Sequence, residues 1–182
     1  MRLTVLAHAE TRRTREGVFG DTSGLAPGAR VGSWPARRAA CVSGPEPACG
    51  QTASLLGLGA APVLADLAGP DVGRWAGRPL AEVLDEDPDG VTAWLRDPDA
   101  VPHGGESLTA LVRRVGKALD AVSWPPGGAV AVVTPLVVRA ALAHALGASG
   151  TAVLRADVPP LGAVTMSRHG GTWRLAALVA PS

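Results

Sequence analysis

One histidine stands where the first apolar segment of the chain ends. Residues 3–11 read LTVLAHAET, so an apolar run stops on His8 and the chain turns polar directly after it. An imidazole can act near neutral pH as a nucleophile or as a general acid and base. His8 is therefore the first candidate for chemistry, and the alternative is a bystander without a role.

Two carboxylates could assist this histidine. Glu106 follows Gly104-Gly105, and Asp71 lies in the loop after Gly69-Pro70. A neighbouring carboxylate and burial both shift the pKa of a histidine, so either residue could set His8 to work as an acid or a base. We predict His8, Glu106 and Asp71 as catalytic residues. Glu106 has the alternative of ordering the start of the following helix by accepting hydrogen bonds from free backbone N–H groups.

The other histidines and the two cysteines suit structural roles better. His103 lies in a Pro-His-Gly-Gly loop and is expected to be solvated, His144 falls in an apolar helix, and His169 falls in a turn. No two histidines stand at metal-ligand spacing, and Cys41 and Cys49 have no partner motif and form no disulfide framework. We therefore expect neither a metal nor a cofactor.

Length and charge narrow the classes of protein. The chain has 182 residues and a formal net charge of +1, which fits one domain over residues 1–182 without a nucleic-acid footprint. The longest apolar run lies near residues 128–138 and ends at Arg139, so it is too short to span a bilayer. No signal-peptide pattern opens the chain. These features predict a cytoplasmic protein whose partner is a small-molecule ligand, not a nucleic acid or a membrane, with a homodimer left open.

The amino-acid usage adds one indication about the source. The chain has no Tyr, Ile or Asn, and Lys117 is its single lysine. This bias is typical of a high-GC genome such as an actinobacterial one, and by association it favours a role in specialised biosynthesis.

The elements that must position these residues follow from the hydrophobic pattern. Strands are predicted at residues 2–7, 39–43, 63–67, 129–134, 163–167 and 173–179. Helices are predicted at residues 48–58, 80–84, 91–95, 107–122 and 135–146. Residues 9–38 are predicted as a long surface loop.

Strands that alternate with helices predict an α/β fold, a three-layer sandwich with a mostly parallel central sheet flanked by helices. Ligands bind beyond the carboxyl ends of the strands in such sheets. His8, Ser43 and Thr134 each follow a predicted strand, so they are expected to meet at one mouth. We expect His8 to face a cavity there, with Trp75 and Glu106 also within reach.

Five blocks of the chain are similar, in order and at matching spacing, to motifs of one family. LAHAET resembles L-V-R-H-G-E-T, and residues 43–53, SGPEPACGQTA, resemble S-S-P-x-x-R-A-x-Q-T-A. Residues 72–83 resemble G-x-W-x-G-x-x-x-x-E-I/V, residues 102–115 resemble a P-x-G-E-S stretch, and residues 131–147 resemble V-S/T-H-G-x-x-I-R-x-L. Together these blocks resemble the histidine phosphatase superfamily, the phosphoglycerate-mutase-like proteins, over nearly the whole chain.

The resemblance implies a phosphohistidine nucleophile at His8, but it also implies that the groups holding the phosphate are replaced. In the family, two arginines and a second histidine clamp the phosphoryl oxygens, and these positions fall on Ala7, Ala48 and Pro135. The family's acid falls on or near Gly69, where Asp66 or Asp71 could substitute, and Glu106 matches the glutamate of the G-E-S stretch.

The mouth is predicted to bind substrate through residues from these blocks and from the loop: Ala7, Arg12, Ser43, Ala48, Trp75, Thr134 and Pro135. Five loop arginines could restore positive charge if the loop folds over the pocket: Arg12, Arg13, Arg15, Arg37 and Arg38. Trp34 and the remaining tryptophans are expected in the core or in a lid.

Three functions remain open. The first is a repurposed enzyme of the cyclase, dehydratase, isomerase or hydrolase type, in which His8 moves protons on a small, largely apolar metabolite. The second is an active phosphomonoesterase that forms phosphohistidine at His8. The third is a catalytically inactive module that binds a metabolite or a protein through the same cleft.

Overall fold

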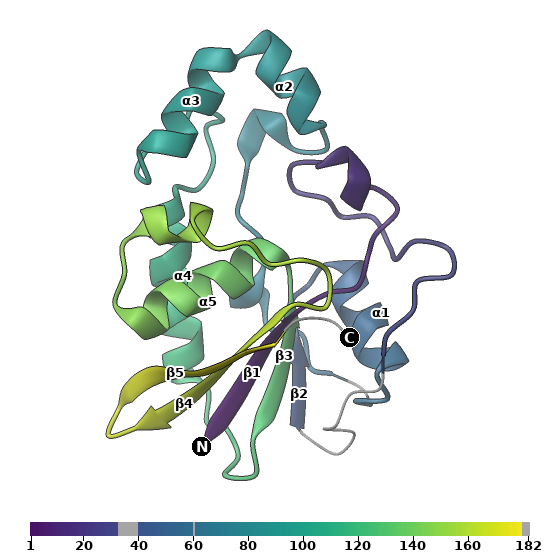
Figure 1. Ribbon diagram of the computed structural model, residues 1–182, viewed down its shortest axis with the longest axis vertical. Helices are drawn as coiled ribbons and strands as arrows, with labels where there is room; N and C mark the ends of the chain where they lie inside the picture. The colour runs from purple at the N-terminus through teal and green to yellow at the C-terminus, as the bar shows by residue number, and fades with distance from the viewer. Residues whose placement is uncertain (33–39, 60, 180–182) are drawn as a thin grey trace.

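The computed structural model describes residues 1–32, 40–59 and 61–179 (Figure 1). One sheet has the strand order β2-β3-β1-β4-β5. The strands are β1 (Arg2–Ala7), β2 (Ala40–Ser43), β3 (Ala129–Val133), β4 (Ala163–His169) and β5 (Thr172–Val179). β1 and β2 both pair with β3 in parallel, whereas β4 is antiparallel to β1 and to β5. The prediction of a mostly parallel sheet therefore holds for its centre.

Helices cover both faces of this sheet and so complete the three layers that the sequence predicts. They are α1 (Pro47–Leu55), α2 (Leu80–Glu86), α3 (Pro88–Arg96), α4 (Leu108–Ala121) and α5 (Pro135–Leu146). Figure 1 shows α4 and α5 on one side of the sheet and α1 on the other. Val5 belongs to the hydrophobic core cluster that contains residues of α4 and α5, whereas the neighbouring Leu6 packs with Cys49 and Ala53 of α1. Because both faces are buried, the strands read as continuous apolar runs.

Local sequence signals set several element ends. Pro135 begins α5 without losing a backbone hydrogen bond, and Gly147 ends it in the left-handed conformation, at φ 62°. Gly170 and Gly171 make the turn between β4 and β5, with φ values of 56° and 83°. These boundaries agree with the predicted ones.

The predicted strand at residues 63–67 is wrong. Val63 makes only one bridge, to Ser43, and Ala65–Leu67 forms a short 3-10 helix. Arg114 on α4 donates hydrogen bonds to the carbonyl oxygens of Asp66 and Ala68, at 2.8 and 3.1 Å. These bonds stabilise a turn where the sheet pattern would otherwise continue.

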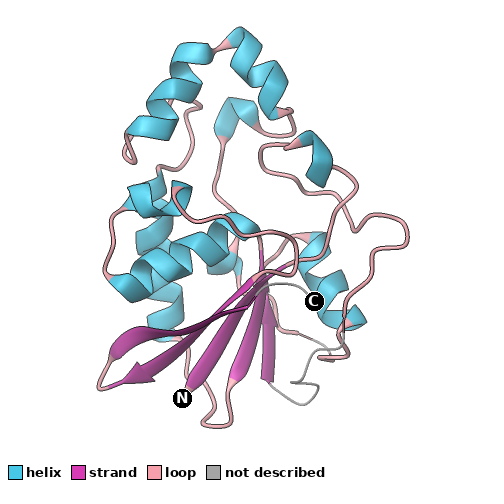
Figure 2. Ribbon diagram, viewed as in Figure 1, coloured by secondary structure: helices cyan, strands magenta, loops and turns pink. Residues whose placement is uncertain are grey.

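A cap formed by α2, α3 and the turn before them lies away from the sheet (Figure 2). It is held by an aromatic cluster in which the ring of Trp75 lies 5.0 Å from Phe19 and 6.3 Å from Trp94, centroid to centroid. The loop after β1 is tied to this cap, because Phe19 N–H donates to the Arg78 carbonyl at 2.9 Å. In the described parts of the chain, we find no helix of the length and apolarity that a membrane span requires.

Candidate active site

His8 extends the pairing of β1 with β3 by one residue. Its backbone N–H donates to the carbonyl of Val133 at 2.9 Å, and its side chain is only 8% exposed. On the far side of β3, Gly44 N–H donates to the carbonyl of Val132 at 2.8 Å. The residues that follow β1, β2 and β3 therefore lie along one edge of the sheet, as the sequence predicts for His8, Ser43 and Thr134.

The imidazole of His8 is held in one tautomer. Its Nδ1 lies 2.8 Å from the carbonyl oxygen of Ala9. A carbonyl oxygen can only accept, so Nδ1 carries the hydrogen and a neutral ring keeps its lone pair on Nε2. Nε2 has no hydrogen-bond partner within residues 1–32, 40–59 and 61–179. The ring is thus oriented for use as a base or a nucleophile.

A buried threonine fixes the segment after His8 against α1. The hydroxyl of Thr52 accepts a hydrogen bond from Ala9 N–H at 2.9 Å and donates one to the Ala48 carbonyl at 2.7 Å. Thr52, Ala48 and Ala7 are all fully buried. Ala7 and Ala48 therefore place only buried methyl groups at these two positions.

Ser43 and Thr134 contribute differently to this edge. Ser43 is 1% exposed, and its backbone pairs with Pro62 and Leu64 at 3.0 and 2.9 Å. Thr134 precedes α5, and its Oγ1 is buried with no hydrogen-bond partner in the described chain. Pro135 is the first residue of α5 and adds no polar group.

Glu106 is bound tightly by an arginine. Arg114 donates from Nε and Nη2 to the two carboxylate oxygens of Glu106, at 2.9 and 2.7 Å. The same guanidinium holds the carbonyls of Asp66, Ala68 and Gly69. This ion pair lies against the loop at residues 66–69 and gives Glu106 a structural contact that differs from the predicted one, because the side chain that caps α4 is that of Ser107.

Asp71 and His103 belong to the cap side of the molecule. An oxygen of the exposed Asp71 carboxylate accepts a hydrogen bond from Gly73 N–H at 2.9 Å. His103 is 2% exposed, so the expectation that it is solvated is wrong. Its ring packs against Trp75 with centroids 5.0 Å apart, and its Nδ1 accepts from Gly105 N–H at 3.0 Å. Burial lowers the pKa of His103, with Asp71 opposing and Arg74 reinforcing that shift.

Trp75 is not placed to stack on a ligand at the sheet edge. It is 1% exposed and lies within the aromatic cluster of the cap. Its role in substrate binding remains a prediction without structural support.

The loop after β1 brings a carboxylate toward His8. Asp21 accepts hydrogen bonds from the Thr11 hydroxyl at 2.5 Å and from Ser23 N–H at 2.8 Å. Burial alone would raise the pKa of Asp21, but these hydrogen bonds and the charge that His8 can carry lower it below its usual value. The Asp21 carboxylate thus lies close enough to His8 for a protonated imidazole to help lower the pKa of Asp21.

Two of the loop arginines that the structure describes are engaged in ion pairs with glutamates. Arg13 pairs with Glu16 at 3.0 Å, and Arg15 pairs with Glu10 at 3.1 Å. Arg12 is exposed. Four residues named in the sequence analysis lie outside the described residues: Trp34, Arg37, Arg38 and Ala39.

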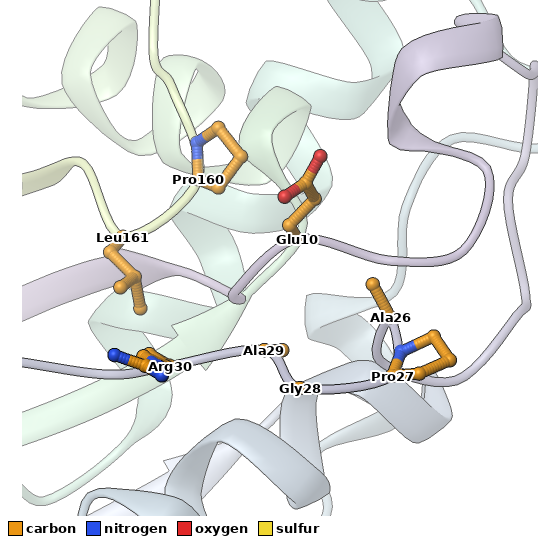
Figure 3. Close-up of a pocket in the computed structure, with 8 residues that line it drawn as sticks. All are labelled: Glu10, Ala26, Pro27, Gly28, Ala29, Arg30, Pro160 and Leu161. Carbon is orange, nitrogen blue, oxygen red and sulfur yellow. The ribbon is translucent and has the colours of Figure 1, made fainter.

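A cavity of about 350 Å³ adjoins this edge (Figure 3). It is lined by Glu10, Ala26, Pro27, Gly28, Ala29, Arg30, Pro160 and Leu161. Leu161 N–H donates to the His8 carbonyl at 3.3 Å, so the wall of the cavity contacts the backbone of His8. None of the predicted site residues lines this cavity, and the expectation that His8 faces it together with Trp75 and Glu106 is not met.

Sequence reasoning missed three polar residues near this edge: Asp21, Thr52 and Glu46. Asp21 lies in the predicted loop at residues 9–38, and Thr52 lies within the predicted helix at residues 48–58. Glu46 falls between the predicted strand at residues 39–43 and that helix, and its Oε1 accepts from Gly69 N–H at 2.6 Å. The available signal was an acidic residue flanked by two prolines directly before a helix.

Solved structures share this architecture. A protein described as mycobacterial hydrolase 1 is 22% identical, with a TM-score of 0.83, over 100% of this chain and 99% of that chain. A mycobacterial glucosyl-3-phosphoglycerate phosphatase is 21% identical, with a TM-score of 0.79, over 100% of this chain and 99% of that one. At these identities the likeness concerns the fold alone.

Sequence comparison finds a relative and a matching family model. A bifunctional protein of Mycobacterium tuberculosis is 34% identical over 100 residues, which make up 53% of this chain and 28% of that protein. The chain thus matches less than a third of the length of this relative. The family model described as "Histidine phosphatase superfamily (branch 1)" matches residues 4–181. The fold, the position of His8 at the end of β1 and this match agree, and the chain belongs to the histidine phosphatase superfamily.

Proposed function

We propose that this family member is an enzyme that uses His8 as a general acid and base on a small, largely apolar metabolite, and that it does not transfer phosphoryl groups efficiently. The reaction would be a cyclisation, dehydration, isomerisation or hydrolysis. The observation that carries the proposal is an oriented imidazole without a cation at the three positions that match the phosphate-binding groups of the family. Nδ1 of His8 is fixed on the Ala9 carbonyl, while Ala7, Ala48 and Pro135 offer no cation beside it.

The charged residues near His8 also favour an enzyme that does not transfer phosphoryl groups efficiently. Phosphoryl transfer requires donors and cations that hold the oxygens of the transferred group. Loss of one such donor typically slows a reaction by about 10²–10³. Asp21 adds a negative charge toward His8, and Arg13 and Arg15 are engaged with glutamates. A phosphate dianion would therefore meet no cation at positions 7, 48 and 135, where the family mechanism needs its phosphate-binding groups.

The adjoining cavity suggests the kind of ligand. Its volume of about 350 Å³ lies at the lower end of the range for small-molecule sites. Ala26, Pro27, Pro160 and Leu161 give its wall apolar surface, Glu10 and Arg30 provide one charge of each sign, and polar and apolar surface are nearly equal. Such a lining suits a compact molecule that carries both polar and apolar groups.

The test compares the purified wild-type protein with His8→Ala. Both would be incubated with a deproteinised small-molecule extract and, separately, with a panel of phosphomonoesters. His169→Ala, at an exposed position, is the matched control. We expect wild type and control to convert an uncharged metabolite that His8→Ala leaves unchanged, with no phosphomonoesterase activity above that of His8→Ala. Rapid phosphomonoester hydrolysis that depends on His8 would overturn the proposal.

An active phosphomonoesterase is the second candidate. It is favoured by the family itself, by the similarity to a structure described as a phosphatase, and by Arg30, which lines the cavity. In that case His8 Nε2 would attack phosphorus, the ester P–O bond would break and release the alcohol, and water would then hydrolyse the phosphohistidine to phosphate. Arg30 would supply part of the missing positive charge. Loss of phosphomonoesterase activity in Arg30→Ala would distinguish this candidate from the first.

A further inference from the structure

The carboxylate of Glu46 occupies a notch between two glycines at the carboxyl edge of the sheet. Its Oε1 lies 3.3 Å from the position that a Cβ on Gly69 would take, and its Oε2 lies 2.8 Å from the position of a Cβ on Gly44. Any larger residue at position 44 would also meet the Leu67 carbonyl at 2.9 Å. The two glycines therefore leave space that the Glu46 side chain fills.

This carboxylate has few partners of its own. Gly69 N–H donates to Oε1 at 2.6 Å, and the Cys49 thiol lies 3.7 Å from Oε2. Within the described chain, Glu46 makes no ion pair. Burial and then the Glu46 carboxylate raise the pKa of Cys49, so the thiol stays protonated beside the carboxylate. Glu46 thus presents a negative charge whose hydrogen-bonding capacity is only partly used.

A second polar group without a partner lies beside it. Oγ1 of Thr134 is 3.5 Å from the same Cβ position on Gly69, and it is buried without a hydrogen bond in the described chain. Buried hydroxyls normally find a partner, and those that lack one call for an explanation. The carboxylate of Glu46 and the hydroxyl of Thr134 therefore converge on one spot.

The sheet places His8 on the other side of Thr134. Thr134 follows β3, which lies between β1 and β2, while His8 follows β1 and Glu46 comes three residues after β2. Neighbouring strands are about 4.8 Å apart, so the ends of β1 and β2 lie roughly 10 Å from each other. A small ligand can span that distance.

We propose that Glu46 is the carboxylate of this active site, acting opposite His8 and recognising a hydroxyl or amino group of the ligand. The assignment deepens the proposed function and rests on it for the reaction, but the position of Glu46 can be tested without a substrate. An acceptor at Glu46 and a donor at Thr134 fit an alcohol or an amine, and they disfavour an oxyanion.

The test follows the titration of His8 by ¹⁵N NMR in the wild type and in Glu46→Gln, which keeps an acceptor for Gly69 N–H. A nearby carboxylate favours the imidazolium, so removing its charge lowers the midpoint of His8. Across roughly 10 Å we expect a fall of about 0.3 pH unit or more. The other charges that face the two groups, Asp21 at His8 and Arg114 with Glu106 on the side of Glu46, stay in place in this variant.

Two controls sharpen the result. Asp85→Asn, at an exposed position on α2, should leave the titration midpoint of His8 unchanged. Glu46→Gln should leave the titration midpoints of His144 and His169 unchanged. In the wild type, the amide of Gly69 should also show an inflection at the midpoint of His8, and His8→Gln should remove it.

The assignment would be overturned if the titration midpoint of His8 is unchanged in Glu46→Gln and the Gly69 amide of the wild type shows no inflection at that midpoint. A shifted midpoint in a protein that converts only phosphomonoesters would uphold the position of Glu46 and reject the proposed reaction. The two failures are therefore distinguishable.

Discussion

Two glutamates near the mouth of the sheet have opposite surroundings. Glu106 receives two hydrogen bonds from Arg114, at 2.9 and 2.7 Å, and so has its charge neutralised and its position fixed. Glu46 receives one bond from a backbone N–H and a weak one from a thiol. Glu106, which matches a family motif, is thus held in an ion pair beside the loop at residues 66–69. Glu46, in the segment before α1, keeps a charge that no ion pair in the described chain offsets. The hydrogen-bond and ion-pair partners of a carboxylate thus determine whether its charge can act on a ligand.

Removal of Arg114 would break this contrast most strongly. Arg114→Ala deletes the ion pair and three bonds to loop carbonyls, and it leaves the largely buried Glu106 carboxylate without its cation. We expect a loss of about 2–4 kcal/mol in the free energy of unfolding, measured by urea denaturation.

The matched control is Arg113→Ala, because the neighbouring Arg113 is exposed. Its effect should stay within about 0.5 kcal/mol. Equal losses in the two variants would mean that the Arg114 contacts do not stabilise the loop.

The His8 side depends on Thr52 instead of an ion pair. Thr52→Val keeps the shape of the side chain but leaves the buried N–H of Ala9 and the carbonyl of Ala48 without partners. Such a loss typically costs about 1–3 kcal/mol. Ser54→Ala, which removes an exposed hydroxyl bonded to the Gly50 carbonyl, should cost less than about 0.5 kcal/mol in the same urea experiment. An unchanged free energy of unfolding in Thr52→Val would contradict this role of Thr52.

The two glutamates can be compared directly by neutralising each one. Glu106→Gln places an amide against the guanidinium of Arg114 and should cost about 1–2 kcal/mol in the free energy of unfolding. Glu46→Gln keeps an acceptor for Gly69 N–H and should cost less than about 1 kcal/mol. Thermal or urea unfolding of both variants measures the difference. A larger cost for Glu46→Gln would reverse the comparison.

The smallest expected effect concerns acid. The folded-state pKa of Asp21 is lowered, so its ionised form contributes stability that is present above its ordinary pKa of about 4 and is lost as the pH falls through the lowered value. Asp21→Asn should therefore lose less stability than the wild type between pH 6 and pH 2, as measured by urea midpoints. Asp85→Asn, on an exposed surface, should follow the wild type. An unchanged acid dependence in Asp21→Asn would show that its hydrogen bonds do not favour the charged form.

The sequence predicts most of the elements because their signals are local. The continuous apolar run at β3 and the Pro135-to-Gly147 frame of α5 each specify an element without reference to the rest of the chain. Residues 63–67 mislead because the turn there depends on Arg114, nearly fifty residues later. The antiparallel β4 is likewise set by its pairing with β1 and not by its own composition.

The site is harder to predict than the fold. The edge position of His8, Ser43 and Thr134 follows from strand ends and is confirmed. The environment of each side chain is not local: Trp75 and His103 are drawn into the cap by aromatic packing, and Glu46 reaches Gly69 across the sheet edge. The position of a glutamate in a motif does not show that Glu106 is paired with Arg114 whereas Glu46 makes no ion pair in the described chain.

The proposed function requires that the residues around His8 do not bind a phosphoryl group. Its most direct test is a titration of the wild-type protein with inorganic phosphate at pH 7, followed by the ¹⁵N resonances of His8, with His169 as the internal control. We expect no saturable shift of the His8 resonances at phosphate concentrations up to about 10 mM. A saturable shift of His8 with a Kd below about 1 mM, and none at His169, would contradict it.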